Sequence, residues 1–444
     1  MLASTLSVPS PAPVVPSFRE AEPKVMIPRN ATFWRKFLAF SGPGYLIAVG
    51  YMDPGNWATD LVGGSKFGYS LLSVILLSNL MAVVLQSLCV KLGIVTGRDL
   101  AQACREHYSR PVGLVLWFLC EIAIIACDLA EVIGAAIALN LLFGLPLLGG
   151  ILLTTADVLI LLVLQQRGVR WLEAIVLTLV LTIAACFAAE LWLAKPDLGA
   201  VAKGFIPTFD VVRNPDMLYV ALGILGATVM PHNLYLHSSI VQSRNYERTE
   251  AGRREAIWFA TLDSTVALTG ALFVNAAILI VSGAVFGPHG QPVEELSDAH
   301  KLLSPLLGSS VASTLFAVAL LASGQSSTLT GTLAGQIVME GFLNIRLSPW
   351  LRRLVTRSLA VIPAVLVVWI YGVKSTNKLL VLSQVILSLQ LSFAVFPLIL
   401  FTGSRAKMGR FVNPGWLQAL AWLVALTIAG LNVKFLWSFA FGTT

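Results

Sequence analysis

The sequence predicts an all-α protein that crosses a membrane many times. Hydrophobic residues fill 57% of its 444 positions and charged residues only 12%, against roughly 25% charged in an ordinary soluble domain. Mean hydropathy is +0.81, so the few charged side chains cannot cover a water-soluble protein of this size. Apolar stretches near or beyond the length of a membrane-spanning helix recur along the chain. The lipid bilayer is therefore the expected partner of most of the surface.

Composition also excludes other classes of protein. The net charge of +7 comes from single basic residues between apolar blocks, without a basic run interleaved with aromatic residues, so nucleic acid is not an expected partner. We find no nucleophile and base constellation, phosphate-binding loop or cofactor motif. The chain is therefore not expected to be an enzyme or to need a cofactor.

The first 34 residues differ from the rest of the chain. They contain six prolines in a mixed polar context, which neither a helix nor the core of a signal peptide tolerates. We expect residues 1–34 to form a disordered cytoplasmic tail and residues 35–438 to form a single transmembrane domain. Eleven apolar stretches are predicted to span the membrane: 37–65, 70–94, 111–138, 147–166, 171–194, 217–243, 256–286, 309–343, 354–373, 377–402 and 414–438.

The basic residues orient these spans. When successive connections are assigned to alternate sides, 22 of the 30 Lys and Arg residues collect on the side of the N-terminal tail. Cytoplasmic loops carry such an excess. We therefore predict a cytoplasmic N-terminus and, since eleven is odd, a C-terminus outside.

The first and sixth spans share an interruption. Asp53-Pro54-Gly55-Asn56 breaks the first span, and Met230-Pro231-His232-Asn233 breaks the sixth. Proline removes a backbone donor and clashes with the preceding turn, so both helices are expected to open there. The alternative, two proline kinks that only bend helices, leaves an ionisable Asp53 at membrane depth unexplained.

This spacing predicts an inverted repeat. Spans one to five, about 37–194, and six to ten, about 217–402, form the two copies, and 414–438 is an extra helix. Five is odd, so the copies have opposite orientations in the membrane. Paired interruptions in such repeats point to a substrate site at the midplane.

The groups at the two interruptions favour a metal ion. Asp53 offers a carboxylate, Asn56 an amide oxygen, the opened backbone its carbonyls, and Met230 a thioether. A thioether contributes little to Mg²⁺ or Ca²⁺ but suits softer transition metals. Mn²⁺, Fe²⁺ and Cd²⁺ are therefore the expected substrates.

These motifs resemble those of the Nramp family of proton-coupled divalent transition-metal transporters, in its bacterial manganese-transporter branch. The resemblance covers the eleven spans and implies a leucine-transporter-like fold in a bacterial cytoplasmic membrane. It implies that Asp53, Asn56, Met230 and the carbonyl of Ala227 bind the metal. The Gly50 carbonyl and Gln384 join them in some conformations.

A stripe of acidic residues follows the third span. Glu121, Asp128 and Glu131 lie within a quarter-turn of one helix face, since offsets of 7 and 10 residues return close to the starting angle. Several buried carboxylates on one face suggest a route for protons.

The resemblance assigns the members of this route. It implies that Asp53, Asp128 and Glu131 take up and release protons, and it places Arg352 and Arg353 against the stripe. The alternative role of the two arginines is to anchor the cytoplasmic end of the ninth span. His232 lies near enough to Met230 in sequence to tune or relay a proton.

The expected function is import of divalent metal together with protons, through alternating exposure of one midplane site. The main alternative is a cation-coupled carrier of amino acids or similar small organic solutes, which can use the same architecture. A metal channel is a further alternative, although channels typically use rings of repeated ligands. A monomer suffices for the expected mechanism.

Overall fold

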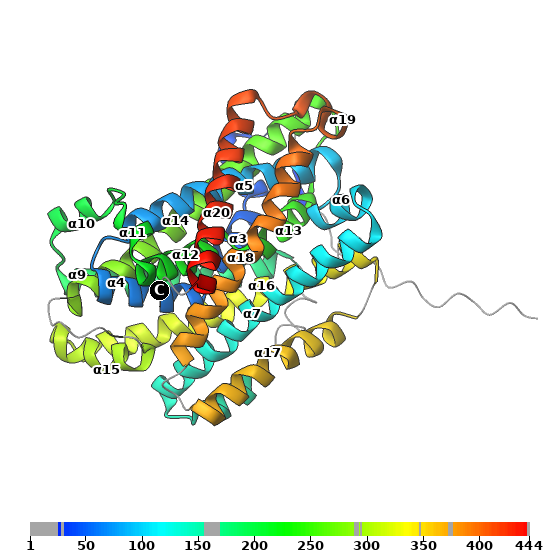
Figure 1. Ribbon diagram of the computed structural model, residues 1–444. Coiled ribbons are helices and arrows are strands. Elements are labelled where there is room, and N and C mark those ends of the chain that lie inside the picture. The colour runs from blue at the N-terminus through cyan, green and yellow to red at the C-terminus, as the bar shows by residue number, and fades with distance from the viewer. Residues whose placement is uncertain are drawn as a thin grey trace, which may run out of the picture.

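A computed structural model describes residues 25–27, 31–154, 169–287, 293, 295–345, 348–371 and 376–441. Long helices pack side by side into one bundle, and shorter helices cover its two ends (Figure 1). The long helices are α5 (Leu72–Thr96), α7 (Arg110–Phe143), α9 (Val169–Ala194), α14 (Glu250–Val285), α16 (Ala312–Leu343), α17 (Pro349–Tyr371), α18 (Thr376–Thr402) and α20 (Gly415–Phe441).

The two interrupted spans each form a pair of shorter helices. The first span is α3 (Pro43–Gly50) followed by α4 (Pro54–Phe67), and the sixth is α12 (Pro215–Val229) followed by α13 (Pro231–Ile240). In each pair the second helix begins at the proline, which fits the first helical position because its missing N–H would have no partner there. Both predicted breaks are therefore confirmed.

The bundle has two distinct ends, which we name after their short helices. The α6 end carries α2 (Phe33–Phe40), α6 (Leu100–His107), α19 (Arg405–Met408) and the short segments η1 (Val241–Ser243) and η4 (Gly409–Phe411). The α10 end carries α10 (Leu198–Gly204), α11 (Asp210–Arg213) and α15 (Leu296–Leu307). Figure 1 places α6 and α19 far from α10 and α15. The pair α3 and α4 runs from the α6 end to the α10 end, and α12 and α13 run the opposite way.

Part of the predicted tail is structured, which corrects the expectation of disorder up to residue 34. Strand β1 (Val25–Met26) pairs in parallel with β2 (Arg244–Asn245), and α2 already begins at Phe33. The reason is apolar packing and backbone pairing: the ring of Phe33 lies 5.8 Å from that of Trp258 and 5.6 Å from that of Phe259. Residues 1–24 and 28–30 of the predicted tail lie outside the described residues.

The positions of the helices agree with most of the predicted spans, but the count of eleven stays a prediction. Helical structure in the fourth span, predicted at 147–166, is described only as far as Thr154. Among the described residues, seven helices are long and apolar enough to cross a membrane, with α12 and α13 counted as one. Residues 354–370 of α17 form a shorter apolar helix.

Small residues let α4 reach the centre of the bundle. A Cβ atom at Gly134 of α7 would lie 2.1 Å from the Cβ of Pro54, and one at Gly64 of α4 would lie 2.4 Å from the Leu279 carbonyl oxygen of α14. Neither position has room for a side chain, so α4 packs closely on both helices. This contact fixes the first break against α7, the helix that carries the acidic stripe.

Candidate functional site

The break between α3 and α4 leaves three residues outside regular α-helix. The amides of Tyr51, Met52 and Asp53 donate to carbonyl oxygens three residues back, so the last turn of α3 tightens before it ends. Asp53 then caps α4: its Oδ1 accepts from the Asn56 backbone amide at 2.8 Å and from Asn56 Nδ2 at 2.9 Å. Asp and Asn stabilise a helix start in this way. The cap therefore holds both predicted ligands at the break.

Side chains from neighbouring helices bind the carbonyl groups that this break frees. Asn275 Nδ2 of α14 donates to the Tyr51 carbonyl oxygen at 2.7 Å, and Ser323 Oγ of α16 donates to that of Met52 at 2.5 Å. Asn275 Nδ2 also lies 3.3 Å from Asn56 Oδ1. Buried carbonyls need such partners where no water reaches. The opened backbone is thus held rigidly in place.

The break between α12 and α13 is sharper. Met230 alone separates the two helices, with φ +33° and ψ 105°, a conformation that costs a non-glycine residue of order 1–3 kcal/mol. Its thioether sulfur lies 3.5 Å from Nδ2 of Asn233, one turn along α13. Met230 belongs to one buried cluster with Cys127 of α7 and Leu387 of α18. The strained backbone aims the sulfur into the centre of the bundle.

The two breaks meet. Asn56 Nδ2 donates to the Ala227 carbonyl oxygen at 3.1 Å, which joins α4 to the end of α12. A Cβ atom at Gly50 would lie 2.4 Å from Asn233 Nδ2 and 3.2 Å from the Met230 sulfur, so the end of α3 touches the start of α13.

Gln384 of α18 completes the group. A Cβ atom at Gly55 would collide with its amide, and one at Gly226 would lie 2.0 Å from its backbone oxygen. Asp53, Asn56, Ala227, Met230 and Gln384 are fully buried, and Gly50 is buried as well. The structure therefore brings all six predicted metal-site residues together.

Two side-chain oxygens in this group have no hydrogen-bond partner in the described part of the chain. Asp53 Oδ2 is buried and has no hydrogen-bond partner among the described residues, and the same holds for Gln384 Oε1. The Ala227 carbonyl and the Met230 sulfur lie beside them. No cluster of three or more His, Cys, Asp or Glu side chains that could hold a metal exists in the part of the chain the structure describes. The candidate donors in this group are therefore a mixture of oxygen atoms and one thioether sulfur, and not a cluster of such side chains.

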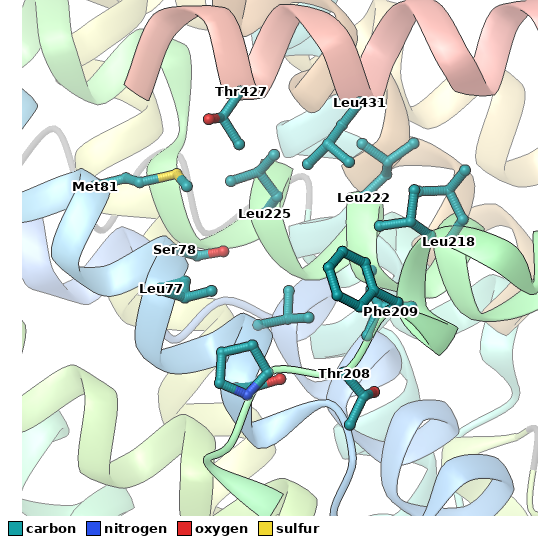
Figure 2. Close-up of a pocket in the computed structure, with 16 residues that line it drawn as sticks. Leu77, Ser78, Met81, Thr208, Phe209, Leu218, Leu222, Leu225, Thr427 and Leu431 are labelled. Carbon is teal, nitrogen blue, oxygen red and sulfur yellow. The ribbon is translucent and has the colours of Figure 1, made fainter. Parts of the chain in front are cut away.

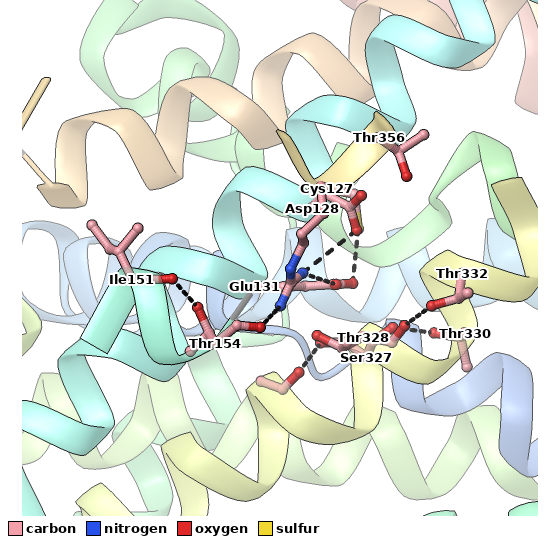
Figure 3. Close-up of polar contacts among 12 residues, drawn as sticks. Cys127, Asp128, Glu131, Ile151, Thr154, Ser327, Thr328, Thr330, Thr332 and Thr356 are labelled. Carbon is pink, nitrogen blue, oxygen red and sulfur yellow. Dashed lines mark hydrogen bonds and ion pairs between the residues drawn. The ribbon is translucent and has the colours of Figure 1, made fainter. Parts of the chain in front are cut away.

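The acidic stripe on α7 is paired with arginines of α17. Arg352 Nη2 lies 2.9 Å from Glu121 Oε1, which also accepts from Trp117 Nε1 at 3.0 Å. Farther along α7, Arg357 Nη1 lies 3.8 Å from Asp128 Oδ1 and 3.5 Å from Glu131 Oε2. Figure 3 shows Asp128 and Glu131 side by side, with Thr154 on one side and Ser327 and Thr328 of α16 on another.

The stripe reaches the metal-site residues through the intervening turn of α7. Cys127 belongs to the same buried cluster as Met230 and precedes Asp128 in α7, and its sulfur is 3.6 Å from Glu131 Oε1. A Cβ atom at Gly331 of α16 would lie 3.0 Å from Glu131 Oε1. The small residues of α16 therefore leave room for the buried carboxylates. The two predicted groups of residues are adjacent parts of one polar region.

Comparison with known proteins decides the family. A family model described as natural resistance-associated macrophage protein-like matches residues 44–438, which include both breaks and the acidic stripe. This chain belongs to the Nramp family. The resemblance inferred from the motifs is confirmed.

Relatives in the Nramp family are similar over nearly their whole length. Proteins named divalent metal cation transporter MntH from Listeria welshimeri and Nostoc are each 63% identical, covering 95% and 94% of this chain and 94% and 95% of the relative. A protein of the same name from Xanthomonas campestris is 61% identical, and the match covers 98% of this chain and 99% of that relative. All three names are those of transporters, in agreement with the expectation that this chain is not an enzyme.

Solved structures support the fold. The Eremococcus coleocola manganese transporter superposes with a TM-score of 0.88 at 44% identity, covering 95% of this chain and 90% of that chain. Mhp1, a nucleobase-cation-symport-1 family transporter, superposes with a TM-score of 0.61 at 16% identity, covering 89% of each chain. The chain thus has the leucine-transporter-like fold predicted for a member of the Nramp family.

One arginine beside the acidic stripe was not singled out from the sequence. We expected Arg352 and Arg353 beside the stripe; Arg352 is there, but the Arg353 side chain lies outside the described residues. Arg357 instead faces Asp128 and Glu131. It lies inside the predicted span 354–373, where an unpaired charge is costly, and that position is the signal that could have identified it.

The two histidines of α13 take different places. His232 is buried, and its Nδ1 has no hydrogen-bond partner among the described residues. His237 Nδ1 lies 2.9 Å from Gln86 Oε1 of α5, and Gln86 Nε2 donates to the Tyr51 hydroxyl at 2.8 Å. This second chain of polar contacts joins α13, α5 and the first break. No sequence pattern singles out Gln86, because one glutamine in an apolar helix has no defining spacing.

Proposed function

We propose that this protein is a secondary transporter that imports Mn²⁺, Fe²⁺ and Cd²⁺ together with protons. The observation that carries the proposal is the contact between the breaks: Asn56 bridges Asp53 and the Ala227 carbonyl beside the Met230 sulfur. Two carbonyl-type oxygens, a carboxylate and a thioether form a donor set for a transition metal. The relatives quoted above are named for divalent metal cation or manganese transport.

The donor set also supports discrimination against other cations. Ca²⁺ and Mg²⁺ prefer oxygen ligands, and Mg²⁺ demands near-ideal octahedral geometry. A thioether in place of one oxygen therefore favours Mn²⁺, Fe²⁺ and Cd²⁺. Gln384 and the Gly50 carbonyl supply further oxygen ligands as the two breaks change their separation.

Import of an amino acid is the less favoured function. Carriers of this fold bind a substrate carboxylate at the N-termini of their half-helices. Here the N-terminus of α4 is already capped by the carboxylate of Asp53. A second carboxylate at this place would be repelled, whereas a cation would be attracted.

The buried acidic residues of α7 supply the route for protons. Asp53 must be ionised to bind the metal, and we propose that its proton moves by way of Asp128 and Glu131. Arg357 offsets their charge and sets which of them holds the proton. His232, two residues after Met230 in the sequence, relays or tunes the same exchange. Glu121 and Arg352 close the pathway at the α6 end.

We propose that the α6 end faces the cytoplasm of a bacterial cell. Arg98, Arg105, Arg244, Arg405 and Lys407 lie in or beside its short elements. Cytoplasmic connections are enriched in such residues. The N-terminus is then cytoplasmic and the C-terminus outside, and a single copy of the 35–438 domain performs the transport.

Uptake into proteoliposomes tests the proposal. Mn²⁺, Cd²⁺, Mg²⁺ and Ca²⁺ uptake would be measured with and without an inward proton gradient, for the parent protein and for Asp53→Ala and Met230→Ala. Saturable Mn²⁺ and Cd²⁺ uptake that the gradient accelerates is the expected result. It should be lost in Asp53→Ala, and Met230→Ala should admit Ca²⁺.

Two control variants separate the site from general damage. Asp298→Ala removes an exposed carboxylate at the α10 end, and Met339→Ala removes a buried methionine of α16 outside the site. Both should retain the parent selectivity. If no divalent metal moves, or if both site substitutions leave uptake unchanged, metal transport at this site is refuted and the organic solute carrier becomes the leading function.

A further inference from the structure

A cavity lies on the flank of the bundle, and none of its lining residues belongs to the two breaks. It has a volume of about 270 Å³ and lies between α5, α12, α20 and the segment that precedes α12 (Figure 2). Its walls are almost entirely apolar; Leu77, Met81, Leu222, Leu225 and Leu431 are among the lining residues. Figure 2 shows these side chains converging on one space from three different helices. Nothing in the metal-transport mechanism uses this cavity.

The surroundings of the cavity indicate that it opens to lipid. Leu77, which lines it, is 40% exposed, and Phe209 at its rim is 80% exposed. On α20 the neighbouring Leu423 and Leu426 are also exposed. Exposed leucines on membrane-spanning helices face hydrocarbon. An occupant can therefore enter sideways from the bilayer.

The depth of the cavity matches a lipid chain. Its lining begins at Val211 and Ser73, at the α10 end, and continues to Met81 on α5 and Leu225 on α12. On α12 the lining extends from Leu218 to Leu225, which is seven positions or about 10 Å of helix. This is about a third of the roughly 30 Å hydrocarbon core. A single acyl chain entering from the interface has this reach.

A basic group lies at the rim. Lys434, one turn beyond Leu431 on α20, is exposed and its ammonium donates a hydrogen bond to the carbonyl oxygen of Val212, which lines the cavity. Lysine side chains near helix ends extend to the interface, where phosphate groups lie. The Thr208 and Ser73 hydroxyls are also at this end of the lining.

We propose that this cavity binds one acyl chain of a phospholipid whose phosphate is held by Lys434. The bound chain packs on Leu218, Ala221, Leu222 and Leu225, which form one side of α12. Because α12 ends beside Met230 and carries the Ala227 carbonyl, the lipid braces the helix that leads into the second break. Binding itself does not depend on which substrate the protein transports.

Photocrosslinking tests the proposal with the purified full-length chain. The probe is phosphatidylglycerol with a diazirine in one acyl chain, and labelled peptides are identified by mass spectrometry. We expect labelling to concentrate on the cavity-facing positions of α5, α12 and α20. Leu431→Trp fills the cavity and should remove most of this labelling. Leu423→Trp places the same bulk on an exposed position of the same helix and should leave it unchanged.

Two further arms address the head group and the fold. A diazirine diacylglycerol, which lacks the phosphate and carries no charge, should label the cavity several-fold less than the phospholipid, and Lys434→Ala should remove that difference. Ser78→Leu fills the cavity from α5 and provides a second variant if Leu431→Trp does not fold. Uniform labelling of the exposed faces of α5 and α20, unaffected by both filling variants, would overturn the proposal.

Discussion

Asn56 holds the two broken helices together, because its side-chain amide donates to the Ala227 carbonyl oxygen across 3.1 Å. The same amide group lies 2.9 Å from Asp53 Oδ1, so one side chain contacts a ligand candidate from each half of the repeat. A metal that binds between Asp53 and Ala227 competes with this amide. The asparagine therefore couples metal binding to the separation of α4 and α12.

Replacement of Asn56 by alanine should weaken metal binding. The change removes one oxygen ligand and the bridge that orients two others, and loss of a group that orients metal ligands typically costs about 10–100-fold in affinity. Isothermal titration of purified protein with Mn²⁺ measures this loss. Asn140→Ala removes an asparagine whose amide binds the Leu145 carbonyl at the far end of α7 and should leave the affinity unchanged. Equal affinities for the parent protein and Asn56→Ala would contradict the proposed ligand set.

Replacement of Asp128 by asparagine should separate metal transport from its dependence on protons. Asparagine keeps the shape of the side chain but cannot exchange a proton. We expect Mn²⁺ uptake to continue at a reduced rate, with a weaker dependence on external pH, in proteoliposomes assayed across a range of pH. Asp298→Asn, at an exposed carboxylate of α15, is the control. A pH dependence as steep as that of the parent would exclude Asp128 from the route.

Loss of Arg357 should destabilise the protein strongly. Its guanidinium is fully buried between Asp128, Glu131 and the Thr154 carbonyl. Removal of one partner from a buried charge pair typically costs about 3–5 kcal/mol. Thermal unfolding of Arg357→Met in detergent should therefore begin well below that of the parent protein.

An exposed arginine gives the comparison for this experiment. Arg254 pairs with Glu250 at the surface, and such pairs contribute about 0–1 kcal/mol, so Arg254→Met should leave the unfolding temperature nearly unchanged. Equal stability of the two variants would show that Asp128 and Glu131 do not need a positive partner.

Gly226 should tolerate no side chain. A Cβ atom there would lie 2.0 Å from the backbone oxygen of Gln384, so Gly226→Ala must push α12 away from α18. Overpacking of this kind costs typically about 1–3 kcal/mol. At Gly270, in the interior of α14, nothing lies within 4 Å of the added atom, and alanine should stabilise the helix by roughly 0.5–1 kcal/mol. The unfolding temperature should therefore fall in Gly226→Ala and rise in Gly270→Ala. A rise in Gly226→Ala would contradict the close packing of α12 on α18.

Much of the fold is predictable from local patterns. Hydrophobic length marks most of the helices, and the prolines at positions 54 and 231 mark both breaks within a residue. The tail was predicted less well. Val25 and Met26 form a strand only because Arg244 and Asn245 offer a backbone edge to them, and no local pattern reveals a partner more than two hundred residues away.

The candidate site was likewise predictable from local patterns only in part. Composition and spacing determined that a carboxylate, an amide and a thioether lie at two helix breaks, since proline and chain length act locally. Tertiary structure alone decided that Asn56 reaches Ala227, that Gln384 packs on Gly55 and Gly226, and that Arg357 faces Asp128 and Glu131. These contacts join segments that are distant in the sequence. Close packing of helices at glycines decides which residues meet, and a buried charge needs an opposite charge beside it.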